Sequence, residues 1–122
     1  MKRGGDLFKG GLRPHLYCLP LPKTRADREA VRAAAFSGER RFFLGSDSAP
    51  HPRHMKESAC CPAGVYTGHH VLEYYADIFD RAGALDRLEA FASHHGADFY
   101  RLPRNADPVT LVRESTAIAA RY

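Results

Sequence analysis

The chain has 122 residues, of which 44% are hydrophobic and 26% charged, and its formal net charge is +4. These values are typical of one folded domain and exclude a wholly disordered chain. No apolar run approaches the ~20 residues that span a bilayer, and the N-terminus lacks an apolar signal segment. The basic residues are scattered among acidic ones. We therefore expect no membrane insertion, no secretion and no nucleic-acid partner.

The cysteine pattern excludes a disulfide framework. The count is odd, and two of the three cysteines, Cys18, Cys60 and Cys61, are adjacent in sequence. Their spacing is also not that of a zinc knuckle. Because free thiols persist in a reducing compartment, we expect a cytoplasmic protein.

The first third of the chain predicts a strand, a helix and a strand. Residues 1–14 are basic and rich in glycine, which indicates a loop or linker. A short apolar run between prolines predicts a buried strand over 15–18. A capping box that begins at Thr24 predicts a helix over 25–37. The bulky residues 41–44 predict the second strand.

The remainder predicts a long loop followed by helices. Residues 46–65 have no clear period, and a loop of this length in a small domain is usually functional. Apolar residues at helical spacing predict a helix over 67–82, with its first residue as the N-cap, and another over 85–95, ended by Gly96. Weak alternation predicts a short strand over 109–113.

The order strand–helix–strand predicts a right-handed βαβ unit with parallel strands. In such units, ligands bind at the C-terminal ends of the strands, here the loops that begin at Leu19 and Ser46. Two parallel strands cannot close a sheet, and their edges would stay open. We therefore expect residues 1–122 to form the end of a larger α/β domain.

Two residues of the second loop are candidates for chemistry. Asp47 follows the second predicted strand almost at once and could bind a divalent metal or act as a general base, although Asp-Ser-Ala-Pro is also good turn chemistry. His51 could bind a carboxylate or a metal, or could simply bond to the backbone. The adjacent histidine pairs do not share one helix face, so packing is the simpler interpretation of His69, His70, His94 and His95.

Four segments together resemble a known family. HLYCLP at 15–20, FFLGSDSAPH at 42–51, KESACCPAG at 56–64 and EAFASHHGADFYRLPRN at 89–105 are similar to the C-terminal part of dihydroorotase, of the single-function type found in bacteria and plants. The similarity extends from about Lys9 to Arg113.

The resemblance implies the last two strands and their helices of a (β/α)8 barrel with a binuclear zinc centre. It implies the reversible hydrolysis of (S)-dihydroorotate to N-carbamoyl-L-aspartate in pyrimidine synthesis. By residue, it implies that Asp47 binds zinc and carries a proton, that His51 binds the substrate carboxylate, and that Leu19 and Ala63 bind the substrate through their backbones. It also implies a homodimer.

This sequence departs from the family pattern in two ways. The family reads Cys-Gly-Cys-Ala-Gly where this chain has Cys60 to Gly64 with Pro62 at the third position, which bears on the loop around Ala63. The other zinc ligands and the arginine that binds the substrate carboxylate are absent from this sequence. We therefore expect the isolated chain to be inactive and to need the N-terminal barrel portion as its partner. The alternative is a non-catalytic remnant that binds metal or anions or acts as an interaction module.

Overall fold

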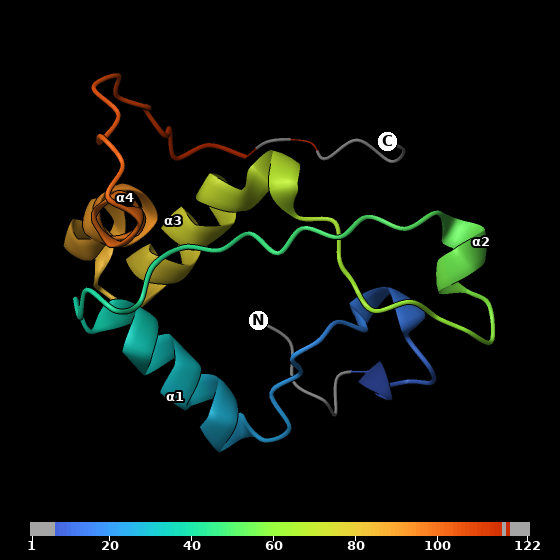
Figure 1. The fold of residues 1–122 in the computed structure, drawn as a ribbon. Helices are drawn as coiled ribbons and strands as arrows, with labels where there is room; N and C mark the ends of the chain where they lie inside the picture. The colour runs from blue at the N-terminus through green and yellow to red at the C-terminus, as the bar shows by residue number, and fades with distance from the viewer. Residues whose placement is uncertain (1–6, 116, 118–122) are drawn as a thin grey trace.

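The computed structural model describes residues 7–115 and residue 117. Helices and connecting segments make up this part of the chain (Figure 1). The α-helices are α1 (Arg25–Phe36), α2 (Arg53–Lys56), α3 (Val71–Arg81) and α4 (His95–Tyr100). A π-helix, Ala90–His94, precedes α4, and the 3-10 turns include Pro14–Leu16, Gly68–His70 and Leu85–Arg87.

Helix α1 confirms the sequence prediction in detail. The Thr24 hydroxyl accepts a hydrogen bond from the Asp27 N–H (3.1 Å), and the Asp27 carboxylate accepts one from the Thr24 N–H (2.8 Å). This capping box satisfies two N–H groups that the first turn leaves free. The helix ends at Phe36, and Gly38 follows it at a φ of +76°, which glycine adopts at little cost.

The start of α3 differs from the prediction in its cap. The helix expected over 67–82 begins only at Val71, after the 3-10 turn Gly68–His70, and the side chain of Thr67 makes no capping hydrogen bond. The hydroxyl of Ser48 instead accepts from the N–H groups of Thr67 (3.1 Å) and Gly68 (2.9 Å). A residue of the long loop thus caps the 3-10 turn, and it ties that loop to the segment just before α3.

The prediction that Gly96 ends the last helix is wrong. The π-helix continues into α4, which ends at Tyr100, and Arg101 follows in the left-handed conformation. The role of Gly96 is close packing, because a Cβ there would lie 3.3 Å from the ring of Phe43. Phe43 also packs against Phe99, with ring centroids 5.3 Å apart.

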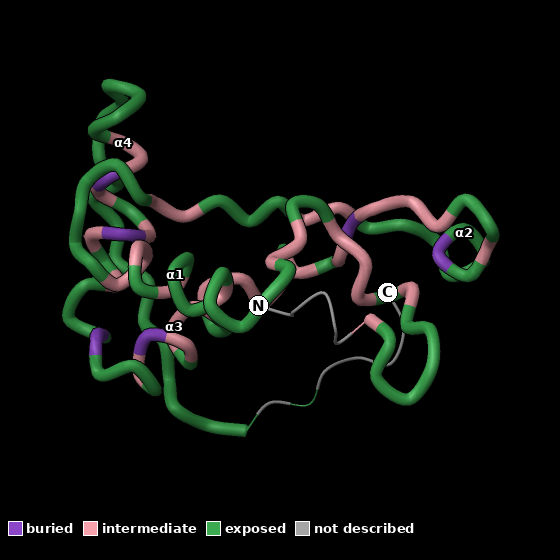
Figure 2. Tube along the Cα trace, turned by 90° about the horizontal axis from the view of Figure 1, so that it is seen from below, coloured by how far each residue is buried: buried purple, intermediate pink, exposed green. Residues whose placement is uncertain are grey.

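The core lies where α1, α3 and the π-helix meet. Phe79 is fully buried, and Phe91 and Ala84 are nearly so. The Phe79 ring packs edge-on against Phe36 at 4.8 Å and against Phe91 at 5.2 Å. Such aromatic pairs add to the stabilisation from burial alone. Figure 2 shows that buried positions are few along the described chain.

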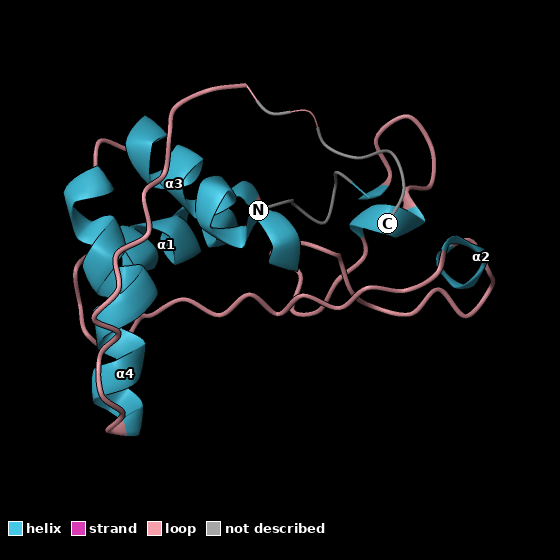
Figure 3. Cartoon of the chain, turned by 90° about the horizontal axis from the view of Figure 1, so that it is seen from above, coloured by secondary structure: helices cyan, strands magenta, loops and turns pink. Residues whose placement is uncertain are grey.

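The expected strands are not formed. Within the described residues, Figure 3 shows helices and loops only, and the segments 15–18, 41–44 and 109–113 belong to no sheet. A parallel bridge between Ser48 and Val65 is the one sheet-like pairing in the part of the chain that the structure describes. A parallel strand exists only through hydrogen bonds to its neighbours. The segment 15–18 begins inside a 3-10 turn, and 41–44 hydrogen-bonds to a helix instead.

The helices gather in one group, and the loop region lies apart from it. Figures 1 and 3 both place α1, α3 and α4 together, with α2 distant from them. The extended residues 41–50 run from the helical group to α2. Candidate site residues on this segment are therefore placed by the helices at one end and by the loop at the other.

Candidate functional site

The segment before Asp47 is held by helical residues. Leu44 donates its N–H to the carbonyl of Phe91 (3.0 Å). The buried ring of His95 donates from Nδ1 to the carbonyl of Phe42 (3.2 Å). The hydroxyl of Tyr75 contacts the carbonyl of Gly45 (3.4 Å), and burial raises the pKa of that hydroxyl. These contacts hold residues 42–45, which precede the candidate site, in place without pairing to a neighbouring strand.

Asp47 lies exposed at the end of this segment. Its φ is +42°, a conformation that aspartate tolerates better than most residues because its short side chain can bond locally. Within the described residues, its carboxylate forms no hydrogen bond or ion pair with another side chain or with the backbone. Both carboxylate oxygens are therefore free to bind a metal ion or to accept a proton.

The next two residues join the two ends of the long loop. Ser48 forms the parallel bridge with Val65, and the N–H of Ala49 donates to the Val65 carbonyl (3.2 Å). Gly64 lies against Ala49, since a Cβ on Gly64 would be 2.5 Å from the Ala49 carbonyl oxygen. The loop from 49 to 64 is thus closed at its base by backbone contacts.

His51 and Ala63 meet within this closed loop. The Nε2 atom of His51 lies 3.1 Å from the Ala63 carbonyl oxygen. A carbonyl oxygen can only accept, so Nε2 donates and carries a proton. That leaves Nδ1 as the ring nitrogen that faces other partners. The contact shows His51 bonded to the backbone, which was the simpler of its two interpretations. The contact uses only one ring nitrogen, so it does not prevent the other from binding a ligand.

Lys56 is the residue that sequence reasoning missed. It is 3% exposed, and its ammonium donates to the carbonyls of Pro62 (2.8 Å), Gly64 (3.0 Å) and Tyr17 (3.1 Å). These three bonds use all three of its donors. Its sequence context, between His54 and Glu57, gave no sign of burial, because lysine is rarely fully buried.

Leu19 is linked to the hydrogen bonds of Lys56 only indirectly, through Tyr17, two residues before it in the chain. The Tyr17 carbonyl accepts from both the Gly64 N–H (3.0 Å) and Lys56, which joins the segment that carries Leu19 to the loop that carries Ala63. Leu19 itself is 57% exposed. No described hydrogen bond joins Leu19 or Asp47 to His51 or Ala63, so the structure brings together two of the four predicted residues directly.

The remaining histidines and cysteines form no further centre. Over residues 7–115 and 117, no three His, Cys, Asp or Glu side chains converge to hold a metal ion. His69 stacks on Tyr66 with centroids 4.6 Å apart, and His70 contacts Glu73 at 3.4 Å. The three cysteines are free thiols.

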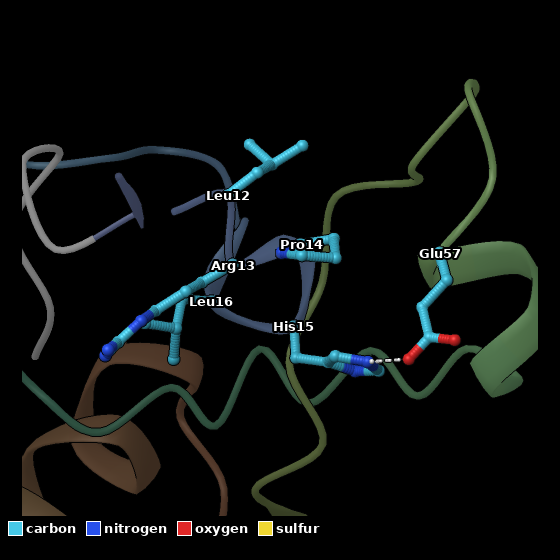
Figure 4. Close-up of a pocket in the computed structure, with 6 residues that line it drawn as sticks. All are labelled: Leu12, Arg13, Pro14, His15, Leu16 and Glu57. Carbon is cyan, nitrogen blue, oxygen red and sulfur yellow. Dashed lines mark hydrogen bonds and ion pairs between the residues drawn. The ribbon is translucent and has the colours of Figure 1, made fainter. Parts of the chain in front are cut away.

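A hollow beside the first 3-10 turn contains none of the predicted site residues (Figure 4). His15 and Glu57 face each other across it at 3.0 Å. The hydrogen bonds from His15 and then from Arg53 lower the pKa of Glu57 below its usual range. All three side chains are exposed, so this ion pair contributes little to stability. The hollow is lined by Leu12, Arg13, Pro14, His15, Leu16 and Glu57.

Comparisons with known proteins agree on one family. The chain is 62% identical over all of its 122 residues to a dihydroorotase of Alkalilimnicola ehrlichii, of which it covers 36%. It is 61% identical over 112 residues to a dihydroorotase of Nitrosomonas europaea, covering 92% of this chain and 32% of the relative. The chain thus spans about a third of the length of these relatives. No family model matches the chain.

Solved structures agree with the sequence relatives. A Saccharomyces cerevisiae dihydroorotase, crystallised with 5-fluoroorotic acid, matches with a TM-score of 0.73 and 39% identity, over 75% of this chain and 25% of its own. A Campylobacter jejuni dihydroorotase also matches with a TM-score of 0.73, at 34% identity, over 84% of this chain and 29% of its own. None of the helices among the described residues is long and apolar enough to cross a membrane. In sequence and in structure, the chain is similar to the C-terminal part of these dihydroorotases, about a third of their length.

Proposed function

We propose that this chain supplies the C-terminal part of a dihydroorotase active site, for the reversible hydrolysis of (S)-dihydroorotate to N-carbamoyl-L-aspartate in the cytoplasm. The observation that carries the proposal is the contact between His51 and Ala63, inside a loop closed one residue after the exposed carboxylate of Asp47. The high identity to dihydroorotases over the whole chain supports it.

The proposed roles follow from the chemistry of each group. The Asp47 carboxylate accepts and returns the proton that moves between the attacking oxygen and the ring amide nitrogen. Nε2 of His51 donates to the Ala63 carbonyl, and a carboxylate only accepts, so His51 would bind the substrate carboxylate as an imidazolium whose Nδ1–H donates to it. The Ala63 N–H and the Leu19 backbone bind the polar atoms of the ring. Binding through the backbone fixes orientation without an additional charge.

Asp47 is suited to be one of several protein ligands of a zinc ion. The Asp47 carboxylate is exposed, and carboxylate oxygen is a normal zinc ligand. No three His, Cys, Asp or Glu side chains converge among the described residues, so further zinc ligands would come from the N-terminal barrel portion. When bound, zinc would polarise the substrate carbonyl and lower the pKa of a water molecule.

The proposal is tested with a chimeric enzyme, called the graft below. This chain replaces the matching third of the Alkalilimnicola ehrlichii dihydroorotase, and dihydroorotate hydrolysis is measured in the graft and in the 122-residue chain alone. We expect activity in the graft and none in the chain alone. Asp47→Asn, which keeps the shape and removes the base, should reduce kcat of the graft by at least about a hundredfold. Asp86→Asn, an exposed substitution, is the matched control. An active Asp47→Asn graft would contradict the assigned role.

A further inference from the structure

The buried ammonium of Lys56 is unusual because it has no acidic partner. Over the part of the chain that the structure describes, no carboxylate forms an ion pair with it, and the aromatic ring of Tyr17 lies with its centroid 5.7 Å from Nζ. A buried charge is tolerated only when its hydrogen bonds are complete. Here three carbonyl oxygens complete them, at 2.8–3.1 Å. Hydrogen bonds to a charged donor are roughly twice as strong as neutral ones.

Two of these carbonyls flank Ala63 in the chain. The Pro62 carbonyl belongs to the same peptide plane as the Ala63 N–H. That peptide is trans, so the N–H points away from the carbonyl that Lys56 binds. Fixing the Pro62 oxygen therefore fixes the direction of the Ala63 N–H. The third carbonyl, that of Tyr17, lies two residues before Leu19.

We propose that Lys56 is a positioning residue for substrate binding: its ammonium gathers the Tyr17, Pro62 and Gly64 carbonyls and so aims the Ala63 N–H and the Leu19 segment at the ligand. This inference rests on the proposed function and deepens it. Lys56 does not touch the substrate. It acts on the backbone groups that do, and it also holds Gly64 and hence the base of the loop that carries His51.

The central variant is Lys56→Met, which keeps most of the side-chain length and removes the charge and its donors. In the active graft we expect KM for dihydroorotate to rise about tenfold while kcat changes less than about threefold, since the lost contacts act on binding rather than on the proton transfer. Lys9→Met, at an exposed lysine, is the control and should change neither. By contrast, Asp47→Asn should lower kcat.

Hydrogen exchange in the 122-residue chain supplies a readout that is independent of activity. The Gly64 N–H donates to the Tyr17 carbonyl, so Lys56→Met should speed its exchange while the amide of the buried Phe79 keeps its protection. If Lys56→Met does not fold, Lys56→Arg is used. Its planar guanidinium keeps the charge but cannot direct three donors at three convergent carbonyls, so KM should still rise.

The outcomes separate the two proposals. An inactive wild-type graft refutes the proposed function and with it the role in substrate binding, whereas the exchange of Gly64 still decides whether Lys56 holds the backbone of the loop. An active graft in which Lys56→Met or Lys56→Arg keeps the wild-type KM overturns the positioning role. Unchanged exchange at Gly64 in the Lys56→Met chain overturns it as well.

Discussion

Substituting Gly64 with alanine should break the base of the candidate loop. Gly64 has a φ of +148°, in a region that is essentially restricted to glycine. The added Cβ would lie 2.5 Å from the Ala49 carbonyl oxygen, 2.6 Å from the Ala49 Cβ and 3.0 Å from Nε2 of His51. Two of these contacts involve backbone or its immediate Cβ, so a side-chain rotation cannot relieve them.

The expected cost follows from these contacts. Backbone strain of this kind costs about 1–3 kcal/mol, and the steric overlap adds to it. A total of about 3 kcal/mol shifts the folding equilibrium of the loop by roughly a hundredfold. The loss of stability is measured by urea unfolding of the chain and, separately, by hydrogen exchange at the Ala49 amide. The His51–Ala63 contact should open with the loop, so the graft should also lose affinity for dihydroorotate.

The control is Gly45→Ala, where a Cβ would meet open space and φ is not positive. It should change stability by less than about 0.5 kcal/mol. Equal stability of Gly64→Ala and the wild-type chain would show that the loop base is not closed as described, and it would refute the reasoning.

Two further predictions concern the helical group. Phe79→Ala should cost about 3–5 kcal/mol in urea unfolding, because Phe79 is fully buried against two aromatic rings, whereas Phe8→Ala, at a 67% exposed side chain, should cost about 1 kcal/mol or less. Hydrogen bonds from the Thr24 N–H, and then from its hydroxyl, lower the pKa of Asp27. The ionised Asp27 therefore stabilises α1 fully at pH values above its unfolded-state pKa, and this stabilisation is lost as the pH falls through its folded-state pKa. An NMR titration of Asp27 should show this, and Thr24→Ala should raise its pKa towards the usual range; an unchanged titration would contradict the capping geometry.

The elements that the sequence predicted correctly carry local signals. Helix α1 has its capping box and Gly38 within a few residues of its own ends. The expected strands had no such support, because a parallel strand depends on partners far away in the chain. The bulky segment 41–44 therefore indicated burial correctly at Phe43 and Leu44, which are partly buried, but it did not indicate which element buries them.

The roles of the candidate site residues stay predictions from the sequence, whereas the residues that support the site are seen only in the structure. Asp47 and His51 stand in a segment whose resemblance is specific, and the structure adds the contact of His51 with Ala63. Lys56 and Ser48 escaped notice because their partners lie up to 39 and 20 residues away. A buried lysine bonded to carbonyls leaves no charge partner in the sequence to indicate it.

A proline at position 62 fits the described loop because the loop uses the carbonyl of this residue and not its N–H. The resemblance raised the question of whether a proline before Ala63 disturbs that contact. Proline lacks an N–H, but the described loop uses only the carbonyl of Pro62, which binds Lys56. The cost falls instead on Cys61, which stands where the family has glycine and adopts a φ of +22°. The fixed φ of proline limits the freedom of the next peptide, so Lys56 and Pro62 together restrain the same N–H group of Ala63.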